Sequence, residues 1–329
     1  MLLRSQLLAV AAATAVVVAA TVATAADETV DRIVQDPAIT ESSGLAASIL
    51  HPGIVWTVND SGDEARLYAV DSDGATAAVL TVDGVDARDW EALAAVRGPD
   101  GVATLWVGDI GDNSSSWDSV RVLRITEPES LSTATVTAQA YDLVYEDGPA
   151  DAEALLADPA SGQLYIATKR ASNPGLYALP AALSSDGSNT LTKIGQVPPV
   201  VTDGAWNPLD GRFALVGYVY AWVYADLGAE PEQFVLPSRP QGETVTWSTD
   251  GGSLLVGSEG VGSTIWRVEV GGQPAPTAEP AATPTDGTVS PGSTVTGASA
   301  TDDGAGLPWW VWALGGAAIV GGVVVVARR

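Results

Sequence analysis

From Val30 to Val270 the chain alternates short apolar runs with turns that are rich in Gly, Asp, Asn and Pro. The runs IVWTVND from Ile54 and TLWVGDIGD from Thr104 show this pattern. There is little of the three-to-four-residue apolar spacing that an amphipathic helix requires. Short strands separated by turn residues predict an all-β domain, which could be a sandwich, a barrel or a propeller.

Five segments of this domain resemble one another. Each begins with small or acidic residues, continues into an apolar strand, and is followed by a second and a third strand. The equivalent positions are Leu45, Leu93, Leu155, Trp206 and Val245, with spacings of 48, 62, 51 and 39 residues. A four-stranded unit of about 40 to 50 residues has the size of a propeller blade. The repeat therefore favours a β-propeller, with a sandwich as the alternative.

The last repeat lacks a fourth strand, because the chain changes character directly after Val270. The segment TVDRIVQ near the beginning of the domain resembles AVLTVDG, which leads into the second repeat. We therefore expect Val30 to Val34 to supply the outer strand of the last blade and so to pair an edge that would otherwise be exposed. This predicts five four-stranded blades. A sixth is the alternative if the long unit between Leu93 and Leu155 contains another.

The first 25 residues have the features of a secretory signal peptide. Arg4 provides a positive charge, Leu7 to Val22 is a run of apolar and small residues, and Ala23-Thr24-Ala25 fits an A-x-A cleavage site. A retained membrane anchor is the alternative. With cleavage after Ala25, the mature chain begins at Ala26, and the ectodomain spans residues 26–270.

The C-terminal part predicts a stalk and an anchor. Residues 271–306 are rich in Pro, Ala, Thr, Ser and Gly, a composition that cannot bury a core. Residues 307–327 carry no charge and are long enough to cross a bilayer as a helix. Tryptophans stand at the outer end of this segment, and Arg328 and Arg329 form a short cytoplasmic tail. The sequence thus predicts a single-pass protein of the cell membrane with its ectodomain outside.

The chain is strongly acidic and contains no cysteine. It has 40 Asp and Glu against 15 Lys and Arg, giving a net charge of −25. Such a surface repels nucleic acid and suits cations, cationic partners or solubility. Disulfides are excluded, so the exported domain depends on burial and hydrogen bonds for its stability.

The acidic residues recur at equivalent points of the repeats. In a propeller the first strand of each blade lines the central channel, and the start of this strand lies at the same face as the end of the second strand. We therefore expect polar side chains from these two places to converge at one end of the channel. The candidate site residues are Asn59, Asp60, Asp89, Glu91, Asp109, Asp112, Asn113, Glu153, Lys169, Arg170, Asp203, Glu243 and Glu259.

A ring of like charges must be neutralised by protonation, by pairing with Lys169 and Arg170, or by a cation. Oxygen ligands without cysteine favour a hard cation such as Ca²⁺. Asp109, at the end of a second strand, is a candidate ligand for such an ion. Solvated turn carboxylates and internal salt bridges are the two alternatives to a metal site.

Catalytic motifs are scarce. His51 is the only histidine and stands in a loop, so a Ser-His-Asp triad has little support. Trp90 and Trp106 could stack on a sugar or an aromatic ligand, but the sequence favours packing between blades as their role.

The motifs SSGLAAS, DWEALAA and NDSGD, with a following Leu-Tyr-x-Val strand, resemble secreted bacterial β-propellers of the NHL, SMP-30/gluconolactonase and phytase-like kind. Some of these families are calcium-dependent hydrolases. The resemblance implies Glu91, Asn59, Glu153 and Asp203 as metal ligands, but a Glu-x-Pro-x-Trp start is absent from the domain.

Two functions follow from these observations. The first is a cell-surface binding propeller that recognises a protein, a glycan or a small molecule at its acidic face. The second is a calcium-dependent hydrolase of phosphate or lactone esters. The sequence favours the binding module over an enzyme.

Overall fold

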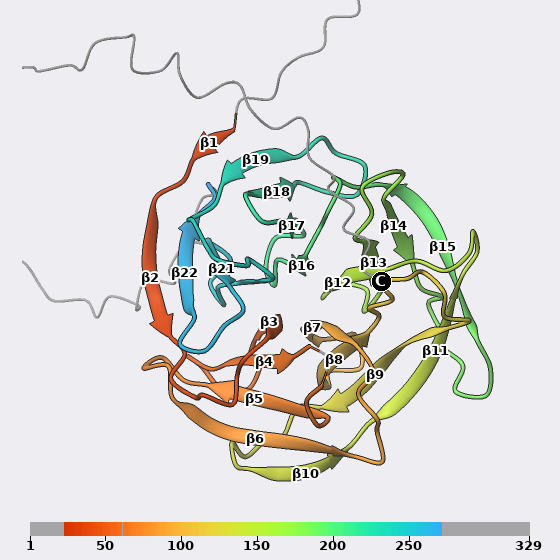
Figure 1. Cartoon of the computed structure of the whole chain (residues 1–329), viewed down its shortest axis with the longest axis horizontal. Coiled ribbons are helices and arrows are strands. Elements are labelled where there is room, and N and C mark those ends of the chain that lie inside the picture. The colour runs from red at the N-terminus through yellow and green to blue at the C-terminus, as the bar shows by residue number, and fades with distance from the viewer. Residues whose placement is uncertain (1–22, 61, 272–329) are drawn as a thin grey trace, which may run out of the picture. The chain divides into compact units, whose positions relative to one another are not determined.

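The computed structural model of the protein describes residues 23–60 and 62–271. These residues all belong to one compact unit and form an all-β, propeller-like ring (Figure 1). Within this part of the chain there is no helix of the length and apolarity needed to span a bilayer. Most of the predicted signal peptide, nearly all of the predicted stalk and the predicted membrane helix at 307–327 lie outside the described residues.

Twenty of the strands fall into five antiparallel runs of four, each ordered from the middle of the ring outward. The first run is β3 (Ser42–Ala47), β4 (Val55–Asn59), β5 (Arg66–Val70) and β6 (Thr76–Asp83). The second is β7 (Trp90–Arg97), β8 (Ala103–Asp109), β9 (Val120–Thr126) and β11 (Gln139–Tyr145). The third is β12 (Ala152–Ala157), β13 (Leu164–Thr168), β14 (Gly175–Ala178) and β15 (Asn189–Gln196).

The remaining two runs complete the ring. The fourth is β16 (Asp203–Trp206), β17 (Phe213–Val216), β18 (Tyr220–Tyr224) and β19 (Glu232–Val235). The fifth is β20 (Thr244–Trp247), β21 (Ser253–Gly257), β22 (Thr264–Glu269) and β2 (Glu28–Ile33). The outer strand of this last run thus comes from the beginning of the domain, as the sequence predicts.

Additional pairings reinforce the rim. The short strand β10 (Ala134–Thr137) pairs in parallel with β6, and β1 (Thr24–Ala25) pairs in parallel with β19. Strand β11 also pairs in parallel with β15 over three residues, which joins the second and third runs into one eight-stranded sheet. These pairings cover strand edges that would otherwise be open to other chains.

The five inner strands, β3, β7, β12, β16 and β20, each contact the next one round the ring. Small residues allow this close packing. A side chain on Gly44 would place its Cβ 2.5 Å from the backbone nitrogen of Leu93, so only glycine fits between β3 and β7. Burying the alternating apolar residues between neighbouring sheets is the dominant stabilisation of such a fold.

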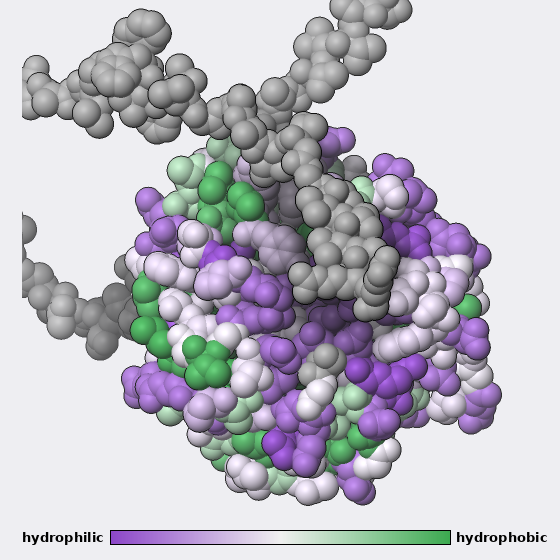
Figure 2. Space-filling view, viewed as in Figure 1, coloured by the Kyte–Doolittle hydropathy of each residue, from purple (hydrophilic) through white to green (hydrophobic). Residues whose placement is uncertain are grey.

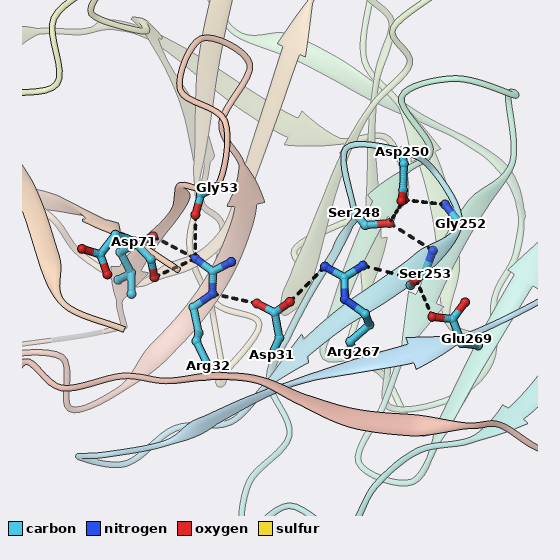
Figure 3. Close-up of polar contacts among 11 residues, drawn as sticks. Asp31, Arg32, Gly53, Asp71, Ser248, Asp250, Gly252, Ser253, Arg267 and Glu269 are labelled. Carbon is cyan, nitrogen blue, oxygen red and sulfur yellow. Dashed lines mark hydrogen bonds and ion pairs between the residues drawn. The ribbon is translucent and has the colours of Figure 1, made fainter. Parts of the chain in front are cut away.

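Arg32 on β2 joins the end of the ring to its beginning (Figure 3). Its guanidinium donates hydrogen bonds of 2.9 to 3.0 Å to the carbonyl oxygens of Gly53, Val70 and Asp71 in the first run. Asp31 accepts from Arg32 at 2.8 Å and from Arg267 on β22 at 2.9 Å. A β-bulge between Val30 and Arg32 lets these neighbouring side chains reach the same network.

Candidate functional site

The strand register brings together the ends that the sequence singles out. The first residue of each inner strand lies opposite the last residue of the second strand, as in the pairs Ser42–Asn59 and Trp90–Asp109. The acidic residues that flank these positions therefore gather at one end of the ring. In the view down the ring axis, hydrophilic residues surround a hollowed centre (Figure 2).

The interior of the ring below this end is nearly filled. Between the inner strands there is a cavity of only about 30 Å³, lined mainly by apolar residues that include Ala46, Ala94 and Ala157. We call the end of the ring that carries these acids the acidic cup, and apolar residues of the inner strands lie next to it inside the ring.

Three carboxylates converge in this cup. One oxygen each from Asp60, Asp89 and Glu91 lies within 4.8 Å of the other two, and we call these residues the carboxylate trio. Asp60 follows β4, Asp89 precedes β7, and Glu91 is the second residue of β7. Glu91 is buried, whereas Asp60 and Asp89 are half-buried.

Burial and mutual repulsion act on the trio. Burial raises the pKa of Glu91 above its usual range, and the charges of Glu153, Asp60 and Asp89 raise it further. Burial also raises the pKa of Asp89, with a contribution from its hydrogen bond with Asp60. At these positions the ionised forms of the carboxyl groups are unfavourable. A positive charge bound beside them would stabilise the ionised forms.

A second group of acids stands beside the trio and consists of Glu153, Glu243 and Glu259, which we call the glutamate cluster. Glu153 and Glu243 are each 4% exposed, and Glu259 is half-buried. Burial is the main cause that raises the pKa of each of the three carboxyls, to about 7 for Glu259. Charge coupling between Glu153 and Glu91 links the cluster to the trio.

Lys169 is one cation of the glutamate cluster, and the buried Arg239, whose charge interacts with Glu243, is another. The ammonium of Lys169 donates to Oε1 of Glu153 and lies 5.6 Å from the centre of the Tyr218 ring. Burial alone would lower the pKa of Lys169, but the charge and the hydrogen bond of Glu153 outweigh it and raise the pKa. Oε2 of Glu153 is buried and has no hydrogen-bond partner among the described residues.

Asp109 belongs to the framework beneath the site. Its carboxylate is fully buried, accepts a 2.6 Å hydrogen bond from Nε of Arg121, and lies 3.6 Å from Nε of Arg88. Its other oxygen accepts the backbone amide of Asp89 at 2.9 Å. Asp109 therefore forms an internal salt bridge that fixes the start of β7.

Asn59 and Asp203 are also engaged by the backbone. Oδ1 of Asn59 accepts the amides of Thr40 and Glu41, each at 3.2 Å. The two oxygens of Asp203 accept the amides of Gly204 and Val245, each at 2.7 Å. These hydrogen bonds tie the inner strands and their loops together.

The other three candidate residues lie toward the edge of the cup. Asp112 is 2% exposed and accepts the amides of Ser116 and Trp117 at 2.7 and 2.8 Å, as a turn residue does. Asn113 is exposed. Arg170 donates to the carbonyl oxygen of Pro149. None of these contacts directs the side chain to the carboxylate trio.

The trio has the chemistry of a hard-cation site. Ca²⁺ takes carboxylate oxygens at about 2.3 to 2.6 Å, so oxygens that share one ion stand up to about 5 Å apart. The oxygens of Asp60, Asp89 and Glu91 meet this condition without rearrangement. Of the carboxylates that the family resemblance implies as ligands, Glu91 belongs to this converging set, whereas Asp203 accepts two backbone amides and Glu153 pairs with Lys169.

Two residues near the site, Tyr218 and Val200, could hardly be identified from the sequence. Tyr218 stands beside Lys169 and is 42% exposed, with its ring at the edge of the glutamate cluster. Val200 has a φ of 59°, which is unusual for a β-branched residue. Its amide donates to the carbonyl oxygen of Arg170 at 3.4 Å, and its own carbonyl oxygen would lie 2.9 Å from a Cβ added at Gly217. Val200 thus contacts both the Lys169 loop and the Tyr218 loop.

The remaining candidates for chemistry lie outside the cup or are buried. His51 lies in the loop from β3 to β4, at the end of these strands opposite Asn59, and its Nε2 forms a 2.8 Å hydrogen bond with the carbonyl oxygen of Pro128. Trp90 and Trp106 are 1% and 9% exposed, so their rings pack in the core.

No protein-family model matches the chain, and no curated protein is significantly similar to it. Among solved structures, the chain is similar to a gluconolactonase from Xanthomonas campestris, described as important in glucose secondary metabolic pathways. The two share 14% sequence identity over 74% of this chain and 89% of the other, with a TM-score of 0.45. This likeness concerns the fold alone.

Proposed function

We propose that the protein is a binding module of the β-propeller kind whose acidic cup holds a hard divalent cation, with Ca²⁺ as the best fit. The convergence of Asp60, Asp89 and Glu91 carries this proposal. The buried oxygen of Glu153 that lacks a partner supports it, because the charge-coupled Glu91 and Glu153 both stand to gain from a positive charge. The bound cation would supply positive charge and open coordination positions for a ligand.

We further propose that the ring has five blades and that β2 closes the fifth. The five antiparallel runs and the contacts of each inner strand with the next support this count. The long second unit, in which a sixth blade could lie, contains β10, which pairs with the rim of the first run.

The place of action that we propose is the outer surface of the cell. The predicted signal peptide, the stalk at 271–306 and the membrane helix at 307–327 support it. In this arrangement the stalk holds the cup away from the membrane, where extracellular calcium and a protein, glycan or small-molecule partner can reach it.

Titration of the purified full chain with Ca²⁺ by calorimetry tests the proposal. We expect saturable binding of one ion, which Asp89→Asn and Glu91→Gln abolish. Asp142→Asn is the matched control, since Asp142 is exposed on the outer strand β11. Absence of binding by the parent chain, or equal binding by Asp89→Asn, would overturn the cation site.

A calcium-dependent hydrolase is the second candidate. The observation that favours it is the free Oε2 of Glu153 beside the trio, since a buried carboxyl with a raised pKa is suited to general acid or base work. Hydrolysis of phosphate or lactone esters that requires Ca²⁺ and is lost in Glu153→Gln would establish it. A panel of such esters left intact in the presence of Ca²⁺ would exclude it.

A further inference from the structure

The glutamate cluster brings together more carboxyl groups than cations. Two cations serve Glu153, Glu243 and Glu259. The ammonium of Lys169 pairs with Glu153 through Oε1, and the buried guanidinium of Arg239 interacts electrostatically with Glu243. The charges of Glu243, Asp60 and Glu41 all raise the pKa of Glu259, after the larger effect of burial. The local field therefore attracts a positively charged group even after one cation has joined the trio.

The cluster also contains a hydrogen-bond acceptor that lacks a donor. Glu153 is 4% exposed, yet its Oε2 has no partner among the described residues. Leaving a buried carboxylate oxygen without a hydrogen bond costs free energy, so a native protein usually supplies a partner. A ligand that brings N–H donors would satisfy this oxygen and add positive charge at the same time.

An aromatic ring lies beside Lys169 of this cluster. Tyr218 is 42% exposed and already lies near one ammonium, since its ring centre is 5.6 Å from Nζ of Lys169. The faces of aromatic rings attract ammonium and guanidinium groups. A small inorganic cation has no carbon chain to pack against the ring. An alkylammonium can contact the ring with its carbon chain.

We propose that Glu153, Glu243 and Glu259, with Tyr218 at their edge, form a subsite for an organic ammonium or guanidinium group. This subsite is separate from the carboxylate trio and extends the proposed binding function to a second, organic ligand. The group can belong to a free polyamine or to a Lys or Arg side chain of a basic protein. The polyamine and the basic side chain both provide a positive charge and N–H donors.

Calorimetric titration of the full chain with spermidine, and separately with hexalysine, tests the subsite in the presence and absence of Ca²⁺. We expect at least one probe to bind, and the affinity to fall about tenfold or more in Glu243→Gln and Glu153→Gln, because each variant removes a charged acceptor. Binding of spermidine alone indicates a polyamine, and binding of hexalysine alone indicates a basic protein partner.

Two further variants separate the subsite from the cation site and from general attraction. Asp89→Asn should lose Ca²⁺ and keep the amine, whereas Glu243→Gln should lose the amine and keep Ca²⁺. Glu41→Gln is the matched control, since Glu41 is an exposed acid at the same end of the ring. Melting temperatures show whether each variant is folded. The proposal is overturned if neither probe binds, or if Glu41→Gln weakens binding as much as Glu243→Gln.

Discussion

Oδ2 of Asp203, on the inner strand β16, accepts a 2.7 Å hydrogen bond from the backbone amide of Val245 on the next inner strand, β20. Oδ1 of Asp151 similarly accepts the amide of Asp112 at 2.9 Å. These carboxylates connect neighbouring sheets. The acidic residues at this end of the ring thus fall into two kinds. The carboxylates of the first kind bind backbone amides or arginines and so stabilise the fold, and those of the second kind have oxygens that face the cup.

Asp109 is the clearest member of the framework kind. We expect Asp109→Asn to lower the free energy of unfolding by about 3 kcal/mol, because the change leaves the partly buried Arg121 without its counter-ion. Urea denaturation measures this loss. Asp100→Asn, which removes an exposed partner of Arg124, is the control and should leave the midpoint nearly unchanged. An Asp109→Asn protein as stable as the parent would show that the buried pair contributes nothing.

The hydrogen bonds of Arg32 should stabilise the closure of the ring, in which β2 pairs with β22 and contacts the first run. We expect Arg32→Met to lower the free energy of unfolding by about 3 kcal/mol, since it leaves three carbonyl oxygens of the first run without this donor. Hydrogen exchange of the amides of β2 and β22 should rise together with this loss. Arg66→Met, in an exposed ion pair, is the control. Unchanged exchange at β2 would contradict the role of Arg32 in closure.

The propeller-like architecture follows from features that are visible in the sequence. Small or acidic starts mark the inner strands, and the likeness of TVDRIVQ to AVLTVDG locates the closing strand because both must fill the same rim position. The division of the acids into two kinds could not be predicted in this way. It depends on which amides and arginines each carboxylate meets, as when the register places Arg121 directly opposite Asp109. The sequence likewise gives no sign that Oδ1 of Asn59 accepts the amides of Thr40 and Glu41.

The stability of the protein should fall as the pH rises. A carboxylate whose pKa is lowered by folding has the opposite effect. Burial raises the pKa of Glu259 to about 7, so the folded protein holds a proton that the unfolded chain releases near its usual pKa of 4.5. The metal-free protein should therefore lose stability as the pH rises from about 4.5 to about 7. Thermal melting in a chelator at several pH values measures this trend, and Glu259→Gln should flatten it. A melting temperature that rises over this range would contradict the pKa direction.

Replacing Val200, whose backbone is strained, by glycine should stabilise the protein. Its φ of 59° is costly for a β-branched residue, so Val200→Gly should raise the free energy of unfolding by up to about 1 kcal/mol. Asn173 has a φ of 53°, but asparagine tolerates this region, so Asn173→Gly should gain less. Thermal melting compares the two variants. A Val200→Gly protein less stable than the parent would mean that the side chain contributes more than the strain costs.

The central claim, that Asp60, Asp89 and Glu91 hold a hard cation, is tested most directly by terbium luminescence of the full chain. Tb³⁺ has the ligand preferences of Ca²⁺, and Trp90 stands between Asp89 and Glu91 in the chain, where it can sensitise the ion. The account predicts saturable emission that Ca²⁺ displaces, that Asp89→Asn abolishes and that Asp142→Asn retains. Emission of equal strength in Asp89→Asn, or none in the parent protein, would contradict it.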